Sequence, residues 1–230
     1  MINVSIIIPV YNEENTIIDI LKVVKGQKVS NIKFEVIVVD DGSNDNTGFL
    51  LYKNKHLYDK IVINKKNSGK GSAIKQGINV AKGSYILFQD ADMEYDPNDY
   101  KNILRPVKNF NADLVIGSRL SGPPVTRVSY FWNKQGNRLI TFLFNLFYNT
   151  TFTDIYSCYV VIKKNLLNIN KIKTNGWEQQ AEILSQVVLK SKVIFEVPIN
   201  YFGRSYEEGK KIRPYHIFKI IFIIIYKRFI

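Results

Sequence analysis

Three carboxylate side chains near the middle of the chain are the residues best suited to chemistry. Asp90, Asp92 and Glu94 stand at every second position, directly after an apolar run, 85–88 (YILF), that predicts a buried strand. Aspartates two residues apart in an extended chain lie on one side, and just past a strand end they can converge on one point. Carboxylates held that close repel each other unless a cation lies between them. Ligands of this kind suit Mg²⁺ or Mn²⁺ carrying a diphosphate; the alternative is a solvated acidic loop.

The composition of the 230 residues bounds the class of protein. With 46% hydrophobic and 13% aromatic residues, the chain can build the core of one large α/β domain. The excess of 32 Lys and Arg over 20 Asp and Glu predicts an anionic partner, which could be nucleic acid, a membrane surface or a phosphorylated substrate. No RNA-binding signature or zinc-ligand spacing supports nucleic acid. The single Cys158 fits a reducing compartment, and the N-terminus predicts a strand rather than a signal peptide.

Continuous apolar, β-branched runs alternate with helical patterns through the first half of the chain. Such runs predict strands covered on both faces, as in a parallel sheet. The expected strands are residues 4–10, 34–39, 60–64, 85–88, 112–117 and 193–198. The expected helices are residues 13–24 (capped by Asn12), a helix from about 68, 129–148 and 178–189. The pattern predicts an α/β fold with a doubly wound, mostly parallel (mixed) sheet flanked by helices.

Four polar loops follow the strands of the predicted sheet. They are residues 11–14, 40–47, 67–72 and 90–96. Right-handed crossovers bring the carboxyl ends of parallel strands to one edge of a sheet, where ligands bind. We therefore expect the four loops to form one site.

Residues in these loops and in one further loop could bind a nucleotide or a phosphate. A carboxylate at the strand end, Asp41, can accept from a base or a ribose, or it can cap the next helix. Lys70 lies between two glycines that could let N–H groups approach an anion, although the segment lacks the full phosphate-loop spacing and could be a flexible turn. Arg119, which follows strand 112–117, can present paired donors to a phosphate.

The C-terminal segment is apolar and basic. Residues 217–230 (IFKIIFIIIYKRFI) are interrupted by Lys219, and the apolar stretch is shorter than the roughly 20 residues that span a membrane. From Arg204 onward, seven basic residues accompany two acidic ones. Residues 213–230 therefore predict an amphipathic interfacial helix on an anionic membrane surface. A core helix folded back on the sheet, or an oligomer contact, is the alternative.

Motifs along most of the chain resemble glycosyltransferase family 2, the nucleotide-diphospho-sugar transferases of the GT-A fold. The similarity runs through SIIIPVYNEENTI, VVDDGSNDNT, NSGKGSAIKQGI, QDADMEYDP, VIGSRL, TDIYSCY and VPINYFGRSYEEGKKI. The last segment is similar to the branch of dolichyl-phosphate mannose synthase, whose members glycosylate a polyprenyl phosphate. The resemblance implies a GT-A domain over residues 1–212, followed by the tail helix 213–230. In TDIYSCY this chain departs from its relatives, with Tyr156 where an acidic residue is usual.

The resemblance also implies roles for individual residues. Tyr11, Glu13 and Asp41 would hold the base and ribose, with Asp40 beside them, and the donor-binding set further includes Pro9, Lys70 and Asp90. Asp90, Asp92 and Glu94 would hold Mg²⁺ or Mn²⁺ with the donor diphosphate. The implied catalytic residues are Asp92, Arg119 and Arg204, the two arginines neutralising phosphate with Lys210 as a further candidate.

We therefore expect a metal-dependent, inverting transfer of a sugar from a GDP- or UDP-sugar to a polyprenyl phosphate. The protein would be cytoplasmic and peripheral on the inner face of the membrane, with no nucleic-acid partner. A phosphate acceptor is already an anionic nucleophile and needs orientation more than a strong base. One alternative is a hydroxyl acceptor, with Glu182 or Asp154 as the base; a non-catalytic binding module is another. The sequence leaves the base, the sugar and the role of Glu94 as a metal ligand open.

Overall fold

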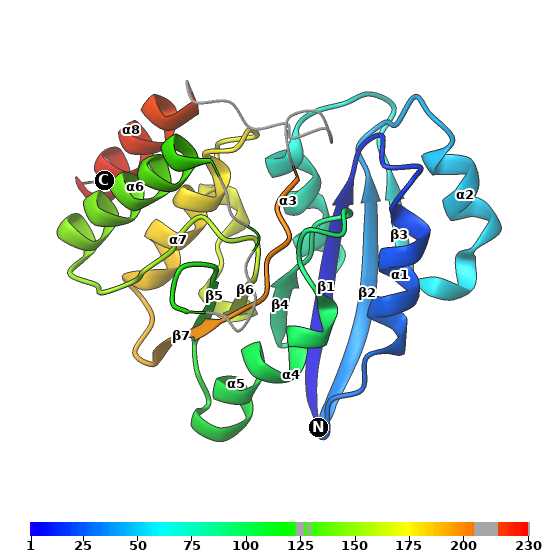
Figure 1. Cartoon of the computed structure of the whole chain (residues 1–230). Coiled ribbons are helices and arrows are strands. Elements are labelled where there is room, and N and C mark those ends of the chain that lie inside the picture. Colours follow the sequence, from blue (N-terminus) through cyan, green and yellow to red (C-terminus); the bar gives the residue numbers. More distant parts are fainter. Residues whose placement is uncertain (123–126, 128–129, 205–215, 230) are drawn as a thin grey trace.

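A mixed sheet forms the centre of the molecule (Figure 1). The structure is a computed structural model and describes residues 1–122, 127, 130–204 and 216–229. The strands are β1 (Ile2–Val10), β2 (Ile32–Asp40), β3 (Lys60–Ile63), β4 (Tyr85–Phe88), β5 (Leu114–Ser118), β6 (Val160–Lys163) and β7 (Ile194–Pro198). Their order is β3-β2-β1-β4-β6-β5-β7, and β6 runs antiparallel to both neighbours while the other pairs are parallel. The predicted doubly wound, mostly parallel sheet is confirmed, and β6 is the strand that the sequence pattern missed.

Helices flank this sheet. They are α1 (Ile17–Gly26), α2 (Thr47–Lys53), α3 (Lys70–Val80), α4 (Tyr100–Ile103), α5 (Arg105–Phe110), α6 (Phe131–Tyr148), α7 (Gln179–Val188) and α8 (His216–Phe229). Single 3₁₀ turns occupy residues 55–57, 97–99, 164–166 and 169–171. The three helices α6, α7 and α8 pack together beyond the β5–β7 end of the sheet (Figure 1). The short helices α2, α4 and α5 were not predicted, because none of them is long enough to show a clear period.

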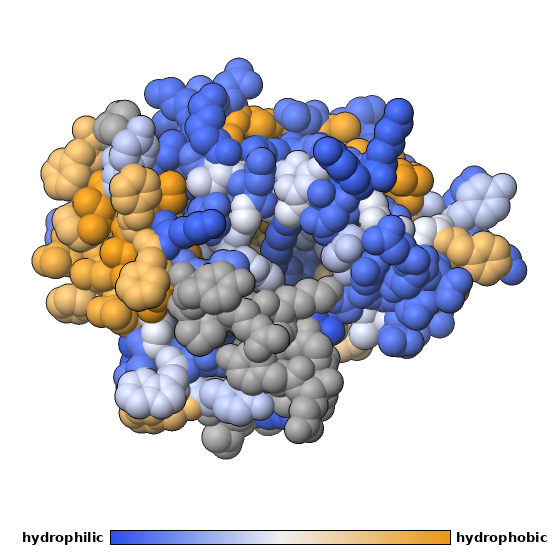
Figure 2. Space-filling view, turned by 90° about the horizontal axis from the view of Figure 1, so that it is seen from above, coloured by the Kyte–Doolittle hydropathy of each residue, from blue (hydrophilic) through white to orange (hydrophobic). Residues whose placement is uncertain are grey.

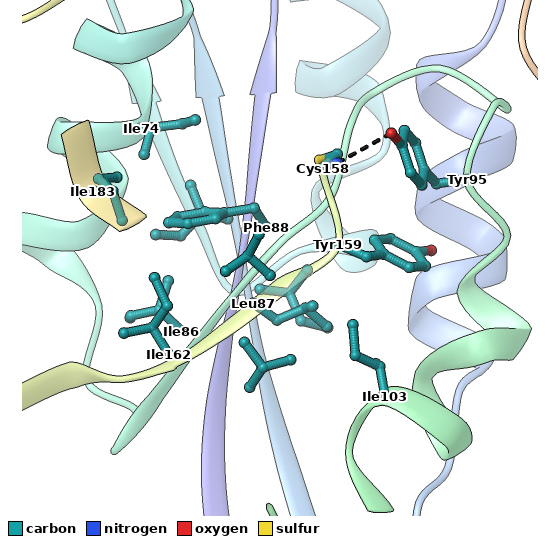
Figure 3. Packing of buried hydrophobic residues seen from close by; sticks show 14 of the residues in the cluster. Ile74, Ile86, Leu87, Phe88, Tyr95, Ile103, Cys158, Tyr159, Ile162 and Ile183 are labelled. Atoms are coloured by element: carbon teal, nitrogen blue, oxygen red, sulfur yellow. Dashed lines mark hydrogen bonds between the residues drawn. The ribbon is translucent and has the colours of Figure 1, made fainter. Parts of the chain in front are cut away.

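The core explains why the central strands are apolar without alternation. In Figure 3, Ile86 and Phe88 of β4 lie on the side of Ile74 in α3, whereas Leu87 lies on the side of Ile103 in α4. All three of these β4 side chains are buried. Because successive side chains of a strand point to opposite faces, both faces of β4 must be covered by other elements.

The first helix begins later than predicted, at Ile17. The segment before it is a loop, with Asn12 in the left-handed region at φ 53°. The Asn12 N–H donates to Ser43 Oγ (3.0 Å), and the Glu13 N–H donates to Thr47 Oγ1 (3.0 Å). Side chains of the neighbouring loop thus take the N–H groups that a helix start would leave open. The prediction that Asn12 caps this helix is wrong for that reason.

The tail helix α8 is docked on the fold through one face. Ile220 and Ile224 are buried, and Tyr148 Oη donates to the carbonyl oxygen of Ile224 (3.0 Å). Lys227 Nζ lies 2.6 Å from Glu182 Oε1 in α7. The predicted boundary at 212/213 and Lys210 lie outside the described residues. None of the described helices is both long and apolar enough to cross a bilayer.

Replacing Gly77 by alanine should lower the free energy of unfolding by about 1–3 kcal/mol, the usual effect of overpacking a core. A Cβ at Gly77 in α3 would meet Ile7 Cγ1 and Val39 Cγ2, both at 3.3 Å, and would clash with Ile7 Cγ2. Urea denaturation of Gly77→Ala against Gly26→Ala checks this, because a Cβ at Gly26 meets nothing within 4 Å. Equal midpoints for the two variants would contradict close packing of α3 on the sheet.

Candidate active site

One cavity of about 890 Å³ brings most of the predicted site residues together. It lies at the carboxyl ends of the parallel strands, the end of the molecule seen in Figure 2. Its lining includes Pro9, Tyr11, Glu13, Asp41, Lys70, Asp90, Asp92, Glu94, Arg119 and Arg204. Asp40 is the predicted residue that is not part of the lining. The four loops expected to meet do contribute to one cavity, because the crossovers return each strand to the same edge.

The adjacent aspartates at the end of β2 have different surroundings. Asp41 is buried, and its carboxylate accepts from Asn64 Nδ2 (2.7 Å) and from the N–H of Gly69 (2.8 Å). Asp40 accepts from the N–H of Ser43 (3.0 Å). Asp41 therefore holds the 64–69 segment at the cavity edge, while Asp40 shapes the turn behind it. Nucleotide binding by either carboxylate stays a prediction.

Lys70 pairs with Asp90, the first aspartate of residues 90–96, which we call the acidic motif. Its Nζ lies 2.5 Å from Asp90 Oδ1 and 5.4 Å from the centre of the Trp177 ring. Although burial lowers the pKa of an ammonium group, the Asp90 charge outweighs it and raises the pKa of Lys70. The N–H groups on either side of Lys70 are already bonded, that of Gly69 to Asp41 and that of Gly71 to the backbone oxygen of Asn175 (2.8 Å). The loop therefore offers the Lys70 side chain rather than a backbone cradle, and anion binding by Lys70 stays a prediction.

Arg204 contacts three carboxylates at once. Its Nη2 lies 2.7 Å from Asp92 Oδ2, its Nε 3.2 Å from Glu94 Oε1, and its Nη1 3.4 Å from Glu13 Oε2. Burial and, to a smaller extent, the charges of Asp90 and Glu94 together raise the pKa of Asp92 to about 7, against the opposing effect of Arg204. The site thus concentrates more negative charge than its own cations neutralise.

Glu94 anchors the strand-like segment that leads to Arg204. Its carboxylate accepts from Tyr201 Oη (2.7 Å) and from the backbone N–H of Arg204 (2.9 Å). Its backbone oxygen accepts from the N–H of Phe202 (2.9 Å). The geometry gives Glu94 a positioning role, and its role as a third metal ligand stays a prediction.

Arg119 is held by a buried carboxylate on the facing loop. Its Nε and Nη2 donate to the two oxygens of Asp154 at 2.7 and 2.9 Å, and its guanidinium lies 5.0 Å from the centre of the Tyr201 ring. Both carboxylate oxygens of Asp154 thereby accept hydrogen bonds from Arg119. The other candidate base, Glu182, is bonded to Lys227 and to the N–H of Thr174 (2.8 Å) and is not part of the cavity lining. Neither carboxylate is poised to deprotonate a hydroxyl acceptor.

The sequence profile of the family described as glycosyl transferase family 2 matches residues 5–169. This chain belongs to glycosyl transferase family 2. It is 29% identical over 217 residues to the low-salt glycan biosynthesis hexosyltransferase Agl6 of Haloferax volcanii, a match that covers 91% of this chain and 50% of the relative. The chain thus spans half the length of that relative. It is 27% identical to the glycosyltransferase AglJ of the same organism, with 98% of this chain and 71% of AglJ covered.

The fold has solved counterparts. Glucosyl-3-phosphoglycerate synthase from Mycobacterium tuberculosis, in complex with Mn²⁺, uridine diphosphate and glucosyl-3-phosphoglycerate, matches with a TM-score of 0.73 and 17% identity. The match covers 100% of this chain and 81% of that one. The predicted GT-A fold and membership among the glycosyltransferases are confirmed. The polyprenyl-phosphate branch stays a prediction.

The donor set of this family 2 enzyme fits a divalent ion that arrives with its substrate. No three His, Cys, Asp or Glu side chains within the described part of the chain form a metal cage of their own. Mg²⁺ and Mn²⁺ instead use one or two carboxylates together with substrate phosphates. Asp90 and Asp92 can supply the carboxylates. The cavity lining carries the five carboxylates Glu13, Asp41, Asp90, Asp92 and Glu94 against the three cations Lys70, Arg119 and Arg204. A divalent cation would balance that excess.

The apolar and aromatic part of the cavity lining was not predicted. It consists of side chains of α6 and α8 and of the loop before α7, among them Trp132, Ile140, Trp177, His216, Ile217 and Ile220. The His216 ring centre lies 6.3 Å from that of Trp177. The aromatic pattern of residues 129–148 and the apolar tail were visible in the sequence, although Ser129 lies outside the described residues. That the two helices meet over one cavity depends on contacts between segments far apart in the chain.

Proposed function

We propose that this enzyme transfers one sugar, with inversion, from a GDP- or UDP-sugar to a polyprenyl phosphate. We further propose that it depends on Mg²⁺ or Mn²⁺ and acts as a peripheral protein on the cytoplasmic, inner face of an anionic membrane. One observation carries this proposal: the acidic motif and apolar side chains of α6 and α8 line the same cavity. An amphiphilic acceptor needs both environments close together.

The polar part of the lining suits the donor. Asp90 and Asp92 would hold the metal with the diphosphate, and the ion would supply charge neutralisation for the departing nucleoside diphosphate. Lys70 and Arg204 are placed to donate to phosphate oxygens, Arg204 with a planar fork that matches them. The solved relative that was crystallised with Mn²⁺ and uridine diphosphate supports this choice of donor.

The apolar part of the lining suits the acceptor. Trp132, Ile140, Ile217 and Ile220 belong to it and can pack against an isoprenoid chain. The acceptor phosphate is an anionic nucleophile, so the reaction needs orientation rather than a base. The engagement of Asp154 and Glu182 by their own partners is consistent with that chemistry.

The outer face of α6 and α8 suits a bilayer surface. Large apolar side chains are exposed along both helices, and hydrophobic colour gathers over them in Figure 2. They are Phe131, Trp132, Leu139, Phe142, Leu146, Phe218, Phe222, Ile225, Tyr226 and Phe229. Exposed basic residues, Lys134, Arg138, Lys219 and Arg228, accompany them. An apolar patch with basic residues around it is typical of interfacial helices on anionic membranes.

Transfer of label from a radioactive nucleotide-sugar tests the reaction. With polyprenyl phosphate and Mn²⁺ present, we expect the labelled sugar to enter the organic phase with either a GDP- or a UDP-sugar. Label that appears only in a water-soluble product would overturn the lipid acceptor and favour a glycan hydroxyl.

Vesicle binding tests the membrane surface separately. The double variant Phe142→Glu/Phe222→Glu should bind anionic vesicles at least about tenfold more weakly than wild type, because each buried phenyl ring contributes more than 1 kcal/mol. The control is Phe49→Glu, since Phe49 is also exposed (56%) but belongs to α2, which lies at the β3 end of the sheet, away from α6 and α8 (Figure 1). Co-sedimentation with vesicles measures both. Equal loss in the two variants, or none, would contradict a docking face on α6 and α8.

A further inference from the structure

Asp90, Asp92 and Glu94 are each already paired with a cation of the enzyme itself. Asp90 is bonded to Lys70, and both Asp92 and Glu94 are bonded to Arg204. The pairs are partly buried: the Arg204 side chain is 23% exposed, against 12% for Asp92 and 13% for Glu94. Ion pairs removed from water in this way are screened less than surface pairs. In the metal-free site, the oxygens that a metal would need are therefore already occupied by cations of the enzyme, although the carboxylates still outnumber those cations.

From this geometry we propose that Arg204 and Lys70 are resident counter-ions that make metal binding depend on the donor diphosphate. The inference rests on the proposed function, because it concerns the same metal and donor. In the free enzyme the two side chains occupy the oxygens of Asp90 and Asp92. In the loaded enzyme they turn to the phosphate oxygens and release those carboxylates to the metal.

The competition follows from the shared atoms. Arg204 Nη2 lies 2.7 Å from Asp92 Oδ2, and Lys70 Nζ lies 2.5 Å from Asp90 Oδ1. A divalent ion on these oxygens would stand within a few ångströms of two positive charges and would be repelled by them. Binding of the metal alone must therefore displace Lys70 from Asp90 and Arg204 from Asp92, and Arg204 then keeps only its longer contacts with Glu13 and Glu94. The diphosphate removes that cost, because it offers anionic oxygens to both.

The consequence is a reciprocal coupling between metal and nucleotide. If the nucleoside diphosphate raises the affinity for the metal, the metal must raise the affinity for the nucleotide by the same factor. The enzyme would select the metal–nucleotide pair over either component alone. It would thus keep bare divalent ions from filling the site unproductively.

A purely structural role for Arg204 makes a different prediction. The segment 201–204 is also fixed by the backbone N–H of Arg204 and by Tyr201 Oη, both of which donate to Glu94. The variant Arg204→Gln keeps those two bonds and removes only the guanidinium. If the guanidinium merely anchors the segment, its loss should leave the affinity for the metal alone unchanged or lower it.

Electron paramagnetic resonance of free Mn²⁺ measures the affinity for the metal with and without UDP or GDP. We expect Arg204→Gln to bind Mn²⁺ alone at least about fivefold more tightly than wild type, within the usual range of coupling factors. The gain in Mn²⁺ affinity on adding the nucleotide should shrink by a similar factor. Lys101→Gln removes one exposed positive charge of α4 and should behave as wild type. Arg204→Lys carries a compact charge that cannot span three carboxylates, so its affinity for Mn²⁺ alone should lie between those of wild type and Arg204→Gln.

The outcomes separate the inference from the proposed function. If neither nucleotide raises the Mn²⁺ affinity of wild type, the proposed donor is wrong. If wild type shows the gain but Arg204→Gln binds Mn²⁺ alone no more tightly and keeps the full gain, only the counter-ion role is overturned. Lys70→Gln tests the same exchange at Asp90 and decides the question if Arg204→Gln does not fold; an unchanged affinity for Mn²⁺ alone would then overturn it.

Discussion

Asp92→Asn is expected to reduce sugar transfer by about a hundred- to a thousandfold, the scale on which single charge-stabilising groups act in enzymes. An amide cannot supply the anionic oxygen that the metal and its diphosphate need at this position. The fold should not suffer, because burial and neighbouring charges raise the pKa of Asp92 to about 7 and so disfavour its ionised form. The thermal midpoint of the metal-free variant should therefore be no lower than that of wild type.

Initial rates at saturating Mn²⁺ measure the effect, and Asp96→Asn is the matched control within the same motif. Asp96 accepts from the N–H of Asn98 (2.9 Å) and is not part of the cavity lining, so its variant should keep activity near that of wild type. Full activity of Asp92→Asn, or of wild type in excess EDTA, would contradict the metal assignment.

Asp154→Ala is expected to lower the free energy of unfolding by about 3–5 kcal/mol, the cost of leaving one partner of a buried ion pair alone. Asp154 is fully buried and Arg119 is 12% exposed, and two short hydrogen bonds join their side chains. Without the carboxylate, the guanidinium stays desolvated and loses both partners. Urea denaturation measures this loss, provided that the dependence of the free energy of unfolding on urea concentration has the same slope in both proteins.

The exposed pair of Lys22 with Asp19 supplies the comparison. Its side chains are 61% and 67% exposed, so Asp19→Ala should cost at most about 1 kcal/mol. The double variant Arg119→Met/Asp154→Leu should recover part of the loss, because removing both charges of a buried pair is tolerated better than removing one. A loss below about 1 kcal/mol in Asp154→Ala would mean that the pair is solvated in solution.

The pair of Arg119 with Asp154 also distinguishes a hydroxyl acceptor from a phosphate acceptor. If Asp154 served as a base for a hydroxyl acceptor, Asp154→Asn would abolish transfer in a variant that still binds the donor. In the arrangement described here, Asp154 acts on Arg119, so its loss should reduce stability together with acceptor use. In the proposed reaction, the acceptor phosphate would meet Arg119, whose position depends on the Asp154 carboxylate behind it.

The strands and the acidic motif could be predicted from the sequence because their signals are local. A strand buried on both faces must be apolar throughout, and residues 4–10 and 34–39 show that within a single segment. The strand β6 was not predicted, because it is four residues long and antiparallel in an otherwise parallel pattern. The start of α1 was misplaced because side chains of the 43–47 loop, about thirty residues away, take the N–H groups of the segment before it.

By itself, the sequence determined the fold class, the edge of the sheet where the site lies, and the residues that surround it. The fold class and this edge follow from short-range patterns and from the handedness of the crossovers, whereas residues such as Glu13 and Arg204 were assigned to the site by the resemblance to family 2. The tertiary structure alone decided which charges pair. Arg119 meets Asp154 across 35 residues, and Arg204 meets Asp92 across 112. It also decided that residues of α6 and α8 line the same cavity as the acidic motif. Such pairings depend on distance and burial in three dimensions, which set the strength of each interaction and leave no trace in the local spacing of residues.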